Sequence, residues 1–170
     1  MMKGKVLVVM GSDSDLPVMR SCIELLHHFQ IPHQVRVCSA HRTPDATHEL
    51  ARTASEEGFQ VIVAGAGAAA HLAGVIAASS TLPVIGVPIA SSALQGVDAL
   101  YSTVQMPGGI PVATMAIGKA GAKNAGILAA QILALGDPQL AASLSRHKEQ
   151  LAEEAARKNQ RMQDELGQHG

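Results

Sequence analysis

The sequence predicts an α/β fold built on a doubly wound parallel sheet with helices on both faces. Short runs rich in Val and Ile alternate with longer helix-like segments, which is the order of strand–helix–strand units. The runs are apolar throughout, as in strands that are buried on both faces. We therefore expect one domain over residues 1–170, a single three-layer sandwich of the flavodoxin-like or Rossmann-like type, followed at its end by an extended C-terminal helix.

The individual elements follow from local signals. Strands are expected over residues 5–10, 34–38, 61–64, 84–87 and 112–117. Helices are expected over residues 16–29, 44–57, 69–79, 96–105 and 119–135. Three helix starts pair a capping side chain with an early proline: Asp15 with Pro17, Thr43 with Pro44, and Asp137 with Pro138. Gly58 is expected to stop the second helix.

The C-terminal segment is charged and favours a helix over about residues 138–167, beyond a core of about residues 5–136. Its apolar residues recur with an eleven-residue period, close to the α-helical pitch, so they form one straight stripe. The stripe consists of Leu140, Leu144, Leu151, Ala155, Met162 and Leu166. It supports two interpretations equally: a helix that packs on its own domain, or one that reaches across to a neighbouring subunit.

Composition restricts the partners. The formal net charge is −1 and no basic stripe occurs, so nucleic acid is not expected, whereas a local cation could still bind an anionic small molecule. The first apolar run is too short for a secretory signal. Residues 61–78 are uncharged but rich in Ala and broken by Gly and His, so no membrane span is expected. Cys22 and Cys38 lack metal-type spacing and are expected to be reduced thiols of a cytoplasmic protein.

Ligands of an open parallel sheet bind beyond the carboxyl ends of its strands. The segments expected there are rich in Gly, Ser and Pro: GSDSD (11–15), SAHRT (39–43), GAGAAAH (65–71), PIASS (88–92) and PGGIP (107–111). In the first, Ser12 and Ser14 could donate to a phosphate at a helix start, and Asp15 could accept from a ribose. Taken alone, an ordinary polar turn explains this segment better.

GAGAAAH matches a dinucleotide-binding pattern only loosely. No Asp or Glu lies between Gly58 and Val97 to hold a ribose, and the pattern belongs after the first strand, not the third. We interpret it as a loop whose small residues let a flat ligand approach the backbone. His71 ends this loop, and a lone His at a helix start is more often structural.

SAHRTP is the most informative segment. Arg42 can bind a phosphate or carboxylate through two parallel hydrogen bonds, and His41 can accept and release a proton near neutral pH. Each alone would be an ordinary loop residue, and the convergence with the other loops favours a site. The usual motifs of phosphoryl transfer, serine hydrolysis and zinc chemistry are absent from the sequence.

Five segments, in order, resemble the N5-carboxyaminoimidazole ribonucleotide mutase family, the class I catalytic subunit of phosphoribosylaminoimidazole carboxylase. They are VMGSDSD, SAHRTP, AGAGAAAHLAG, PVIGVP and STVQMPGGIPVAT. The resemblance covers about residues 6–135. Ala73 stands where this family usually has Pro, which we expect to loosen the loop beside the imidazole ring without abolishing activity.

The resemblance implies an isomerase of purine (IMP) biosynthesis that uses no metal or cofactor. It would move a carboxylate from N5 to ring carbon C4 by releasing, trapping and re-adding CO₂, with His41 as the acid and base. Substrate contacts are implied for Ser12, Ser14, Asp15, Ser39, Arg42, Gly67, Ala69, His71 and Leu72. A homo-octamer is also implied, as is transient contact with the ATP-dependent synthetase that supplies the substrate.

Two alternatives stay open. The first is direct carboxylation of aminoimidazole ribonucleotide with CO₂, although that branch has SAHKT where this chain has SAHRT. The second is a nucleotide-binding module without catalytic activity.

Overall fold

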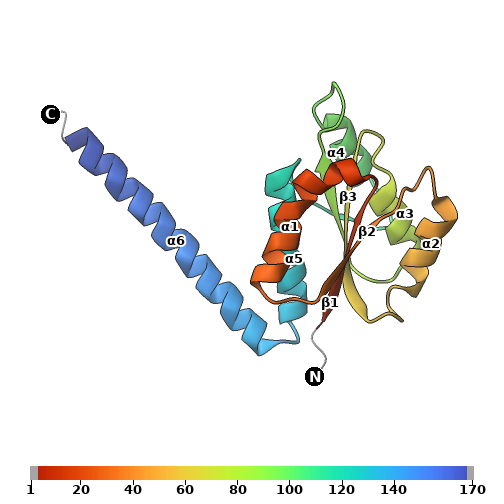
Figure 1. Ribbon diagram of the computed structural model, residues 1–170, viewed down its shortest axis with the longest axis horizontal. Helices are drawn as coiled ribbons and strands as arrows, with labels where there is room; N and C mark the ends of the chain where they lie inside the picture. Colours follow the sequence, from red (N-terminus) through yellow and green to blue (C-terminus); the bar gives the residue numbers. More distant parts are fainter. Residues whose placement is uncertain (1–3, 168–170) are drawn as a thin grey trace.

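The computed structural model describes residues 4–167 and confirms the predicted α/β class (Figure 1). Five strands form one all-parallel sheet in the order β2-β1-β3-β4-β5. The strands are β1 (Lys5–Met10), β2 (His33–Val37), β3 (Phe59–Gly67), β4 (Val84–Ile89) and β5 (Ala113–Thr114). Their shared direction brings all five carboxyl ends to one edge of the sheet.

Helices cover both faces of this sheet. They are η1 (Asp13–Asp15), α1 (Leu16–His28), α2 (Pro44–Thr53), α3 (Leu72–Ser79), α4 (Val97–Val104), α5 (Lys119–Ala134) and α6 (Pro138–Gly167). In Figure 1, α1 and α5 lie on one side of the sheet, and α2 and α3 lie on the other. The arrangement is the doubly wound, three-layer sandwich that the strand–helix alternation predicts.

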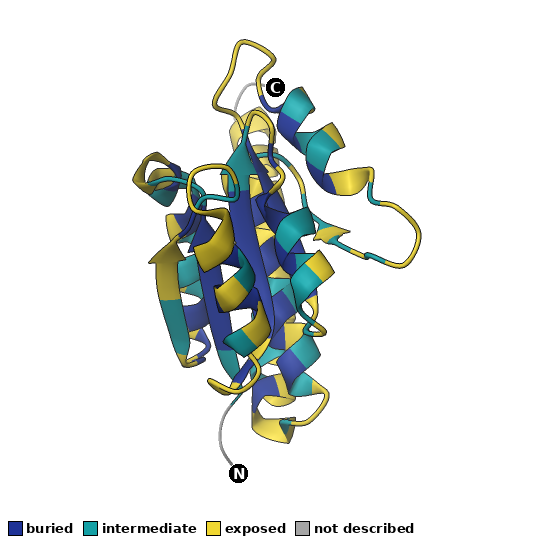
Figure 2. Ribbon diagram, turned by 90° about the vertical axis from the view of Figure 1, so that its right-hand side faces the viewer, coloured by how far each residue is buried: buried dark blue, intermediate teal, exposed yellow. Residues whose placement is uncertain are grey.

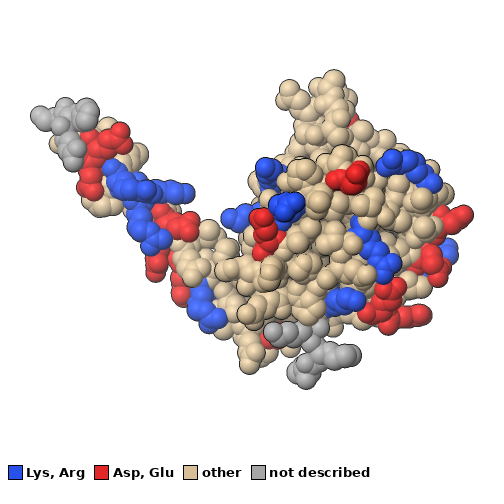
Figure 3. Space-filling view, viewed as in Figure 1, with Lys and Arg blue, Asp and Glu red and all other residues tan. Residues whose placement is uncertain are grey.

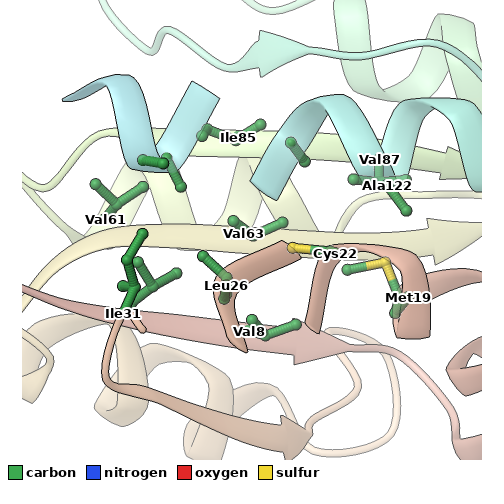
Figure 4. Close-up of a cluster of buried hydrophobic side chains, with 14 of the residues drawn as sticks. Val8, Met19, Cys22, Leu26, Ile31, Val61, Val63, Ile85, Val87 and Ala122 are labelled. Atoms are coloured by element: carbon green, nitrogen blue, oxygen red, sulfur yellow. The ribbon is translucent and has the colours of Figure 1, made fainter. Parts of the chain in front are cut away.

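Alternate strand residues feed two separate cores, because successive side chains of a strand point to opposite faces. On the α1/α5 face, Val8 and Val63 pack with Met19 and Leu26 (Figure 4). The opposite core holds the remaining strand side chains with α2 and α3: Leu7, Val9, Ile62, Leu50, Leu72 and Ile76. Figure 2 shows the central strands buried between partly exposed helices. The apolar strand pattern thus reflects burial on both faces.

Small residues allow α1 and α5 to pack closely. A methyl group at Gly126 of α5 would lie 3.0 Å from the Cβ atom of Leu25 and 3.1 Å from the carbonyl oxygen of Cys22, both on α1. Ala122, Ala125 and Ala129 of α5 are fully buried. A core with almost no aromatic residues therefore gains its density from close helix approach.

Several elements differ in extent from the prediction. The last strand covers only Ala113–Thr114, where residues 112–117 were expected, because it pairs with β4 over two residues at the sheet edge. Helix α3 begins at Leu72, three residues late, since tight turns close Ala68 to Ala70 and Ala69 to His71. Helix α2 ends at Thr53, before a turn that Gly58 closes with φ of +84°.

The structure confirms the early prolines of the three helices, but only one of the three predicted capping side chains. Asp137 caps α6 as expected, because its Oδ1 accepts from the backbone N–H groups of Gln139 (3.0 Å) and Leu140 (3.1 Å). Asp15 and Thr43 make no side-chain cap to α1 and α2. Their side chains bond backward to Ser12 and Ser39, so both caps were wrong, and both side chains instead shape the loops at the sheet edge.

Helix α6 leaves the sandwich after a short attachment. Leu140 is buried and Leu144 packs against the α1/α5 core. Beyond them the apolar stripe is open: Leu151, Met162 and Leu166 are exposed, and the helix projects away from the domain (Figure 1). Packing on its own domain therefore accounts only for the beginning of the stripe. No helix within residues 4–167 is long and apolar enough to cross a membrane.

Candidate active site

The loops after four strands line one hollow of about 340 Å³ at the carboxyl edge of the sheet. The lining residues are Gly11, Ser12, Ser14, Asp15, Ser39, His41, Arg42, Gly67 and Ser91. This size lies at the lower end of the range for small-molecule sites. The hollow brings together most of the predicted site residues, whereas Ala69, His71 and Leu72 are not part of its lining.

The loop after β1 is held by its own side chains. The Ser12 N–H donates to Oδ2 of Asp15 at 3.0 Å, and the Ser12 hydroxyl oxygen accepts from the N–H of Ser14 at 3.3 Å. These reciprocal bonds form a capping box around the short helix η1. The Ser12 and Ser14 hydroxyls lie 3.0 Å apart, so a paired hydroxyl surface faces the hollow.

Asp15 is the buried ionisable group of this loop, with 6% of its surface exposed. Burial raises the pKa of its carboxyl above the ordinary value. The hydrogen bond from Ser12 and the positive charge of Arg42 act in the opposite direction, with smaller effect. A carboxylate in this position costs stability, which is typical of groups kept for binding or chemistry.

The loop after β2 is tied to the first loop through Arg42. One terminal guanidinium nitrogen donates to the carbonyl oxygen of Gly11 at 2.8 Å, and Nε donates to the Ser39 hydroxyl at 3.3 Å. No carboxylate pairs with Arg42 in the salt bridges of residues 4–167. The remaining N–H groups of the guanidinium are therefore available to an anion in the hollow.

His41 contacts His71 from the neighbouring loop. Nε2 of His41 lies 2.8 Å from Nδ1 of His71, so one nitrogen donates and the other accepts. The rings meet edge to face, with centroids 4.9 Å apart and an interplanar angle of 80°. Both side chains are exposed. His71, interpreted from sequence as a loop end, is thus the direct partner of the proton-transfer candidate.

The glycines of the third loop serve contacts within the protein. A side chain at Gly65 would overlap the thioether of Met19, and one at Gly67 would overlap the hydroxyl of Ser91. Packing within the protein therefore requires both glycines, and Gly67 also lines the hollow. Ala68 follows with φ of +51°, a left-handed conformation uncommon for alanine, and the tight turn it starts brings the chain back to His71.

The remaining predicted residues lie beside the hollow. Ala69 is exposed on the turn, and Leu72 is buried in the core between the sheet and helices α2 and α3. Ala73 is also buried there, in the first turn of α3, and not in the loop itself. Sequence reasoning named the segment PIASS but not Ser91, whose single polar atom gives no local signal.

A cavity of about 120 Å³ lies near the opposite end of the sheet, lined by apolar side chains such as Phe29 and Leu140 and by polar ones such as Asp137 and Gln139. It lacks the paired proton carrier and cation of the first hollow. Across residues 4–167, no group of three or more His, Cys, Asp or Glu side chains is arranged to hold a metal ion.

The sequence model of the family described as AIR carboxylase matches residues 5–154, which include every loop of the hollow. The chain belongs to the AIR carboxylase family.

Members of the AIR carboxylase family resemble this chain over most of its length. The N5-carboxyaminoimidazole ribonucleotide mutase of Thermotoga maritima is 52% identical over 94% of this chain and 92% of its own. The mutase of Escherichia coli strain K12 is 59% identical over 80% of each chain. That of Bacillus subtilis is 55% identical over 87% of this chain and 91% of its own. The predicted family resemblance is confirmed.

The AIR carboxylase fold is also found in solved structures. The crystal structure of Treponema denticola PurE superposes with a TM-score of 0.80 at 28% identity, over 91% of this chain and 95% of that one. A crystal structure of a PurE2 variant from the same organism gives a TM-score of 0.83 at 27% identity, over 94% and 98%. The superposition covers the three-layer sandwich described above.

Proposed function

We propose that this chain is the enzyme, an isomerase, that interconverts N5-carboxyaminoimidazole ribonucleotide and 4-carboxy-5-aminoimidazole ribonucleotide in purine biosynthesis. One observation carries the proposal: a proton carrier, His41, and a free cation, Arg42, line the same hollow in a chain 52–59% identical to proteins named as this mutase. The reaction needs an anion-binding group and a two-way proton carrier, and these residues supply both.

The phosphate end of the ribonucleotide is assigned to the first two loops. Arg42 has unused N–H donors, and the hydroxyls of Ser12 and Ser14 lie beside it in the hollow. Charge-assisted hydrogen bonds of this kind suit a phosphate. Asp15, which a phosphate would repel, is assigned to the ribose hydroxyls. The loop around Gly67 and Ala69, with His71 and Leu72 behind it, is assigned to the imidazole end, and Ser39 to orienting Arg42.

The proposed chemistry balances with one imidazole. The N5–carboxylate bond breaks, CO₂ leaves, and protonated His41 gives its proton to N5. Carbon C4 then attacks the trapped CO₂ and forms the new C–C bond. His41 takes the proton that C4 loses and returns to its starting state. The sum is a transfer of the carboxylate within one molecule, and no electron acceptor or donor is required.

Retention of CO₂ is the second requirement. A molecule that escapes must be recaptured from solution, so holding it against C4 removes a large entropic barrier. The tight turns at Ala68 to His71 lie beside the hollow, and the His41–His71 contact ties them to a residue of its lining. We propose that the bound ribonucleotide covers the hollow.

We also propose that the full chain, residues 1–170, acts as one mutase domain in a cytoplasmic homo-octamer. The exposed apolar residues of α6, Leu151, Met162 and Leu166, support assembly because contiguous exposed apolar surface marks protein contacts. Transient contact with the ATP-dependent synthetase would deliver the labile substrate. Light scattering of the purified chain tests the octamer, and a monomer at micromolar concentration would contradict it.

The decisive assay compares two substrates. We expect turnover of freshly made N5-carboxyaminoimidazole ribonucleotide without added bicarbonate, followed by the absorbance of the product. Efficient turnover only of aminoimidazole ribonucleotide with bicarbonate would assign direct carboxylation instead. Binding of both ribonucleotides without turnover of either would assign a binding module.

A further inference from the structure

We infer that Ser91 is a substrate-positioning residue whose hydroxyl donates a hydrogen bond to the migrating carboxylate. This inference rests on the proposed function. Ser91 follows β4 and lines the hollow that contains His41, Arg42 and Gly67. Within residues 4–167 no hydrogen bond engages its hydroxyl, whereas the adjacent Ser92 donates to Asp98 at 2.7 Å and accepts from Leu94.

The place of Ser91 in the sheet puts it at the imidazole end of the ligand. The strand order is β2-β1-β3-β4, and neighbouring strands are about 4.8 Å apart, so the end of β4 lies about 10 Å from that of β1. The phosphate is assigned to the loop after β1 together with Arg42. A group that follows β4 is therefore too far along the sheet edge to share that phosphate.

Packing against Gly67 fixes the position of the Ser91 side chain. A Cβ atom at Gly67 would overlap the Ser91 hydroxyl and would lie 2.7 Å from its Cβ atom. The hydroxyl thus lies directly against the third loop, which also leads to His71 and hence to His41. This contact explains why position 67 carries no side chain, and it gives the hydroxyl a defined place beside the reacting ring.

The negative charge of the substrate carboxylate requires a hydrogen-bond donor near Ser91. The ligand has two anionic groups, the phosphate and the carboxylate, and Arg42 is assigned to the first. The carboxylate at the other end lies near the proton carrier His41, and it also needs a donor that lets it move between N5 and C4. One hydroxyl on a fixed backbone can donate to either position of the carboxylate without trapping it as an ion pair would.

Binding of two ribonucleotides tests the inference, because only one carries the carboxylate. Calorimetry should show that Ser91→Ala weakens binding of 4-carboxy-5-aminoimidazole ribonucleotide by about tenfold to a hundredfold, the range for a hydrogen bond to a charged group. Binding of aminoimidazole ribonucleotide, which lacks the carboxylate, should change by less than about twofold. The ratio kcat/KM should fall with the first affinity.

Matched variants separate a specific role from a disturbed loop. Ser92→Ala removes the neighbouring hydroxyl and should affect the two ligands alike. Gly67→Ala should displace the Ser91 hydroxyl, and adding Ser91→Ala to it should cause no further loss for the carboxylated ligand. An equal effect of Ser91→Ala on both ligands, or no effect on either, would overturn the inference.

Failure of this inference can be distinguished from failure of the proposed activity. Wild-type turnover of N5-carboxyaminoimidazole ribonucleotide tests the function, and the ligand-dependent loss in Ser91→Ala tests the residue. A wild-type chain that isomerises its substrate while Ser91→Ala binds both ligands normally would refute the role of Ser91 alone.

Discussion

Nε2 of His41 and Nδ1 of His71 lie 2.8 Å apart, although the residues are separated by thirty positions in the chain. His41 follows β2 and His71 follows β3, and β1 lies between these strands in the sheet. The contact therefore joins the loops that follow the two neighbours of β1. Among residues 4–167, Nδ1 of His41 makes no hydrogen bond, so it is the nitrogen left for a substrate.

Replacing His41 by Asn should abolish proton transfer and preserve binding. We expect turnover to fall by at least about a hundredfold, the usual scale of general acid–base catalysis, while the Kd for aminoimidazole ribonucleotide stays within a few-fold. His33→Asn is a matched control, because the one hydrogen bond of its side chain within residues 4–167 is to the carbonyl of Ile31. Normal turnover by the His41 variant would refute the proposed mechanism.

Replacing His71 by Asn should have a smaller effect than replacing His41. His71 positions His41, and loss of one hydrogen bond predicts a fall in kcat of about tenfold. The double variant should be no slower than His41→Asn alone. Multiplying effects would show that His71 acts independently.

Arg42 should control affinity for the phosphate. We expect Arg42→Ala to raise KM and the Kd of phosphorylated ligands by about tenfold or more, with a smaller change in kcat. Arg42→Lys should recover only part of the affinity, because an ammonium cannot reproduce the planar, two-point contact. The unphosphorylated nucleoside is the control ligand. Its affinity should be the same for wild type and both variants.

Asp15→Asn should make folding less sensitive to pH. Burial raises the pKa of Asp15 in the folded chain, so the folded state holds its proton to higher pH than the unfolded state does. The wild-type free energy of unfolding therefore falls as pH rises from about 4, the ordinary aspartate pKa, to the raised value, and then stays level.

The asparagine of this variant carries no titrating proton, and its side-chain oxygen can still accept from the N–H of Ser12. We would measure urea unfolding between about pH 3.5 and pH 8, a range that brackets the ordinary aspartate pKa. The free energy of unfolding of the variant should increase relative to that of wild type as the pH rises. If the free energy of unfolding of the variant instead decreased relative to wild type as the pH rises, the carboxylate would stabilise the fold. Ligand binding should weaken in the variant if Asp15 serves the ribose.

Ala73→Pro should be tolerated by the fold. Ala73 is the second residue of α3, and Pro17 occupies the same position in α1. The N–H groups of a first helical turn have no acceptor within the helix, so a proline there loses no bond. We expect the free energy of unfolding to rise by up to about 1 kcal/mol, measured by thermal or urea unfolding. A clear loss would show that the ring collides with the core beside Gly86.

Local signals in the sequence account for most of the fold. Uniformly apolar runs identify the buried strands β1, β3 and β4, and prolines near Asp15, Thr43 and Asp137 identify three helix starts. The residues at which each element begins and ends are less predictable. Only the sheet edge decides that the last strand stops at Thr114, and only the left-handed turn at Ala68 delays α3.

The candidate site likewise has features that the sequence predicts and features that only the structure shows. Segments at strand ends could be predicted to converge, because parallel strands share one carboxyl edge. Which atoms meet there depends on the order of the strands in space. The contact between His41 and His71 and the packing of Ser91 on Gly67 join residues of different loops, and no spacing in the chain encodes either one.

We expect assembly through helix α6 to make the thermal stability of this protein depend on its concentration. Basic and acidic side chains are interspersed along its projecting part (Figure 3), while Leu135 at its approach is 91% exposed. A helix that gains its apolar contacts from other copies loses them on dilution, by mass action. The melting temperature should therefore fall as samples are diluted, and a chain shortened before Leu151 should melt at one temperature whatever its concentration.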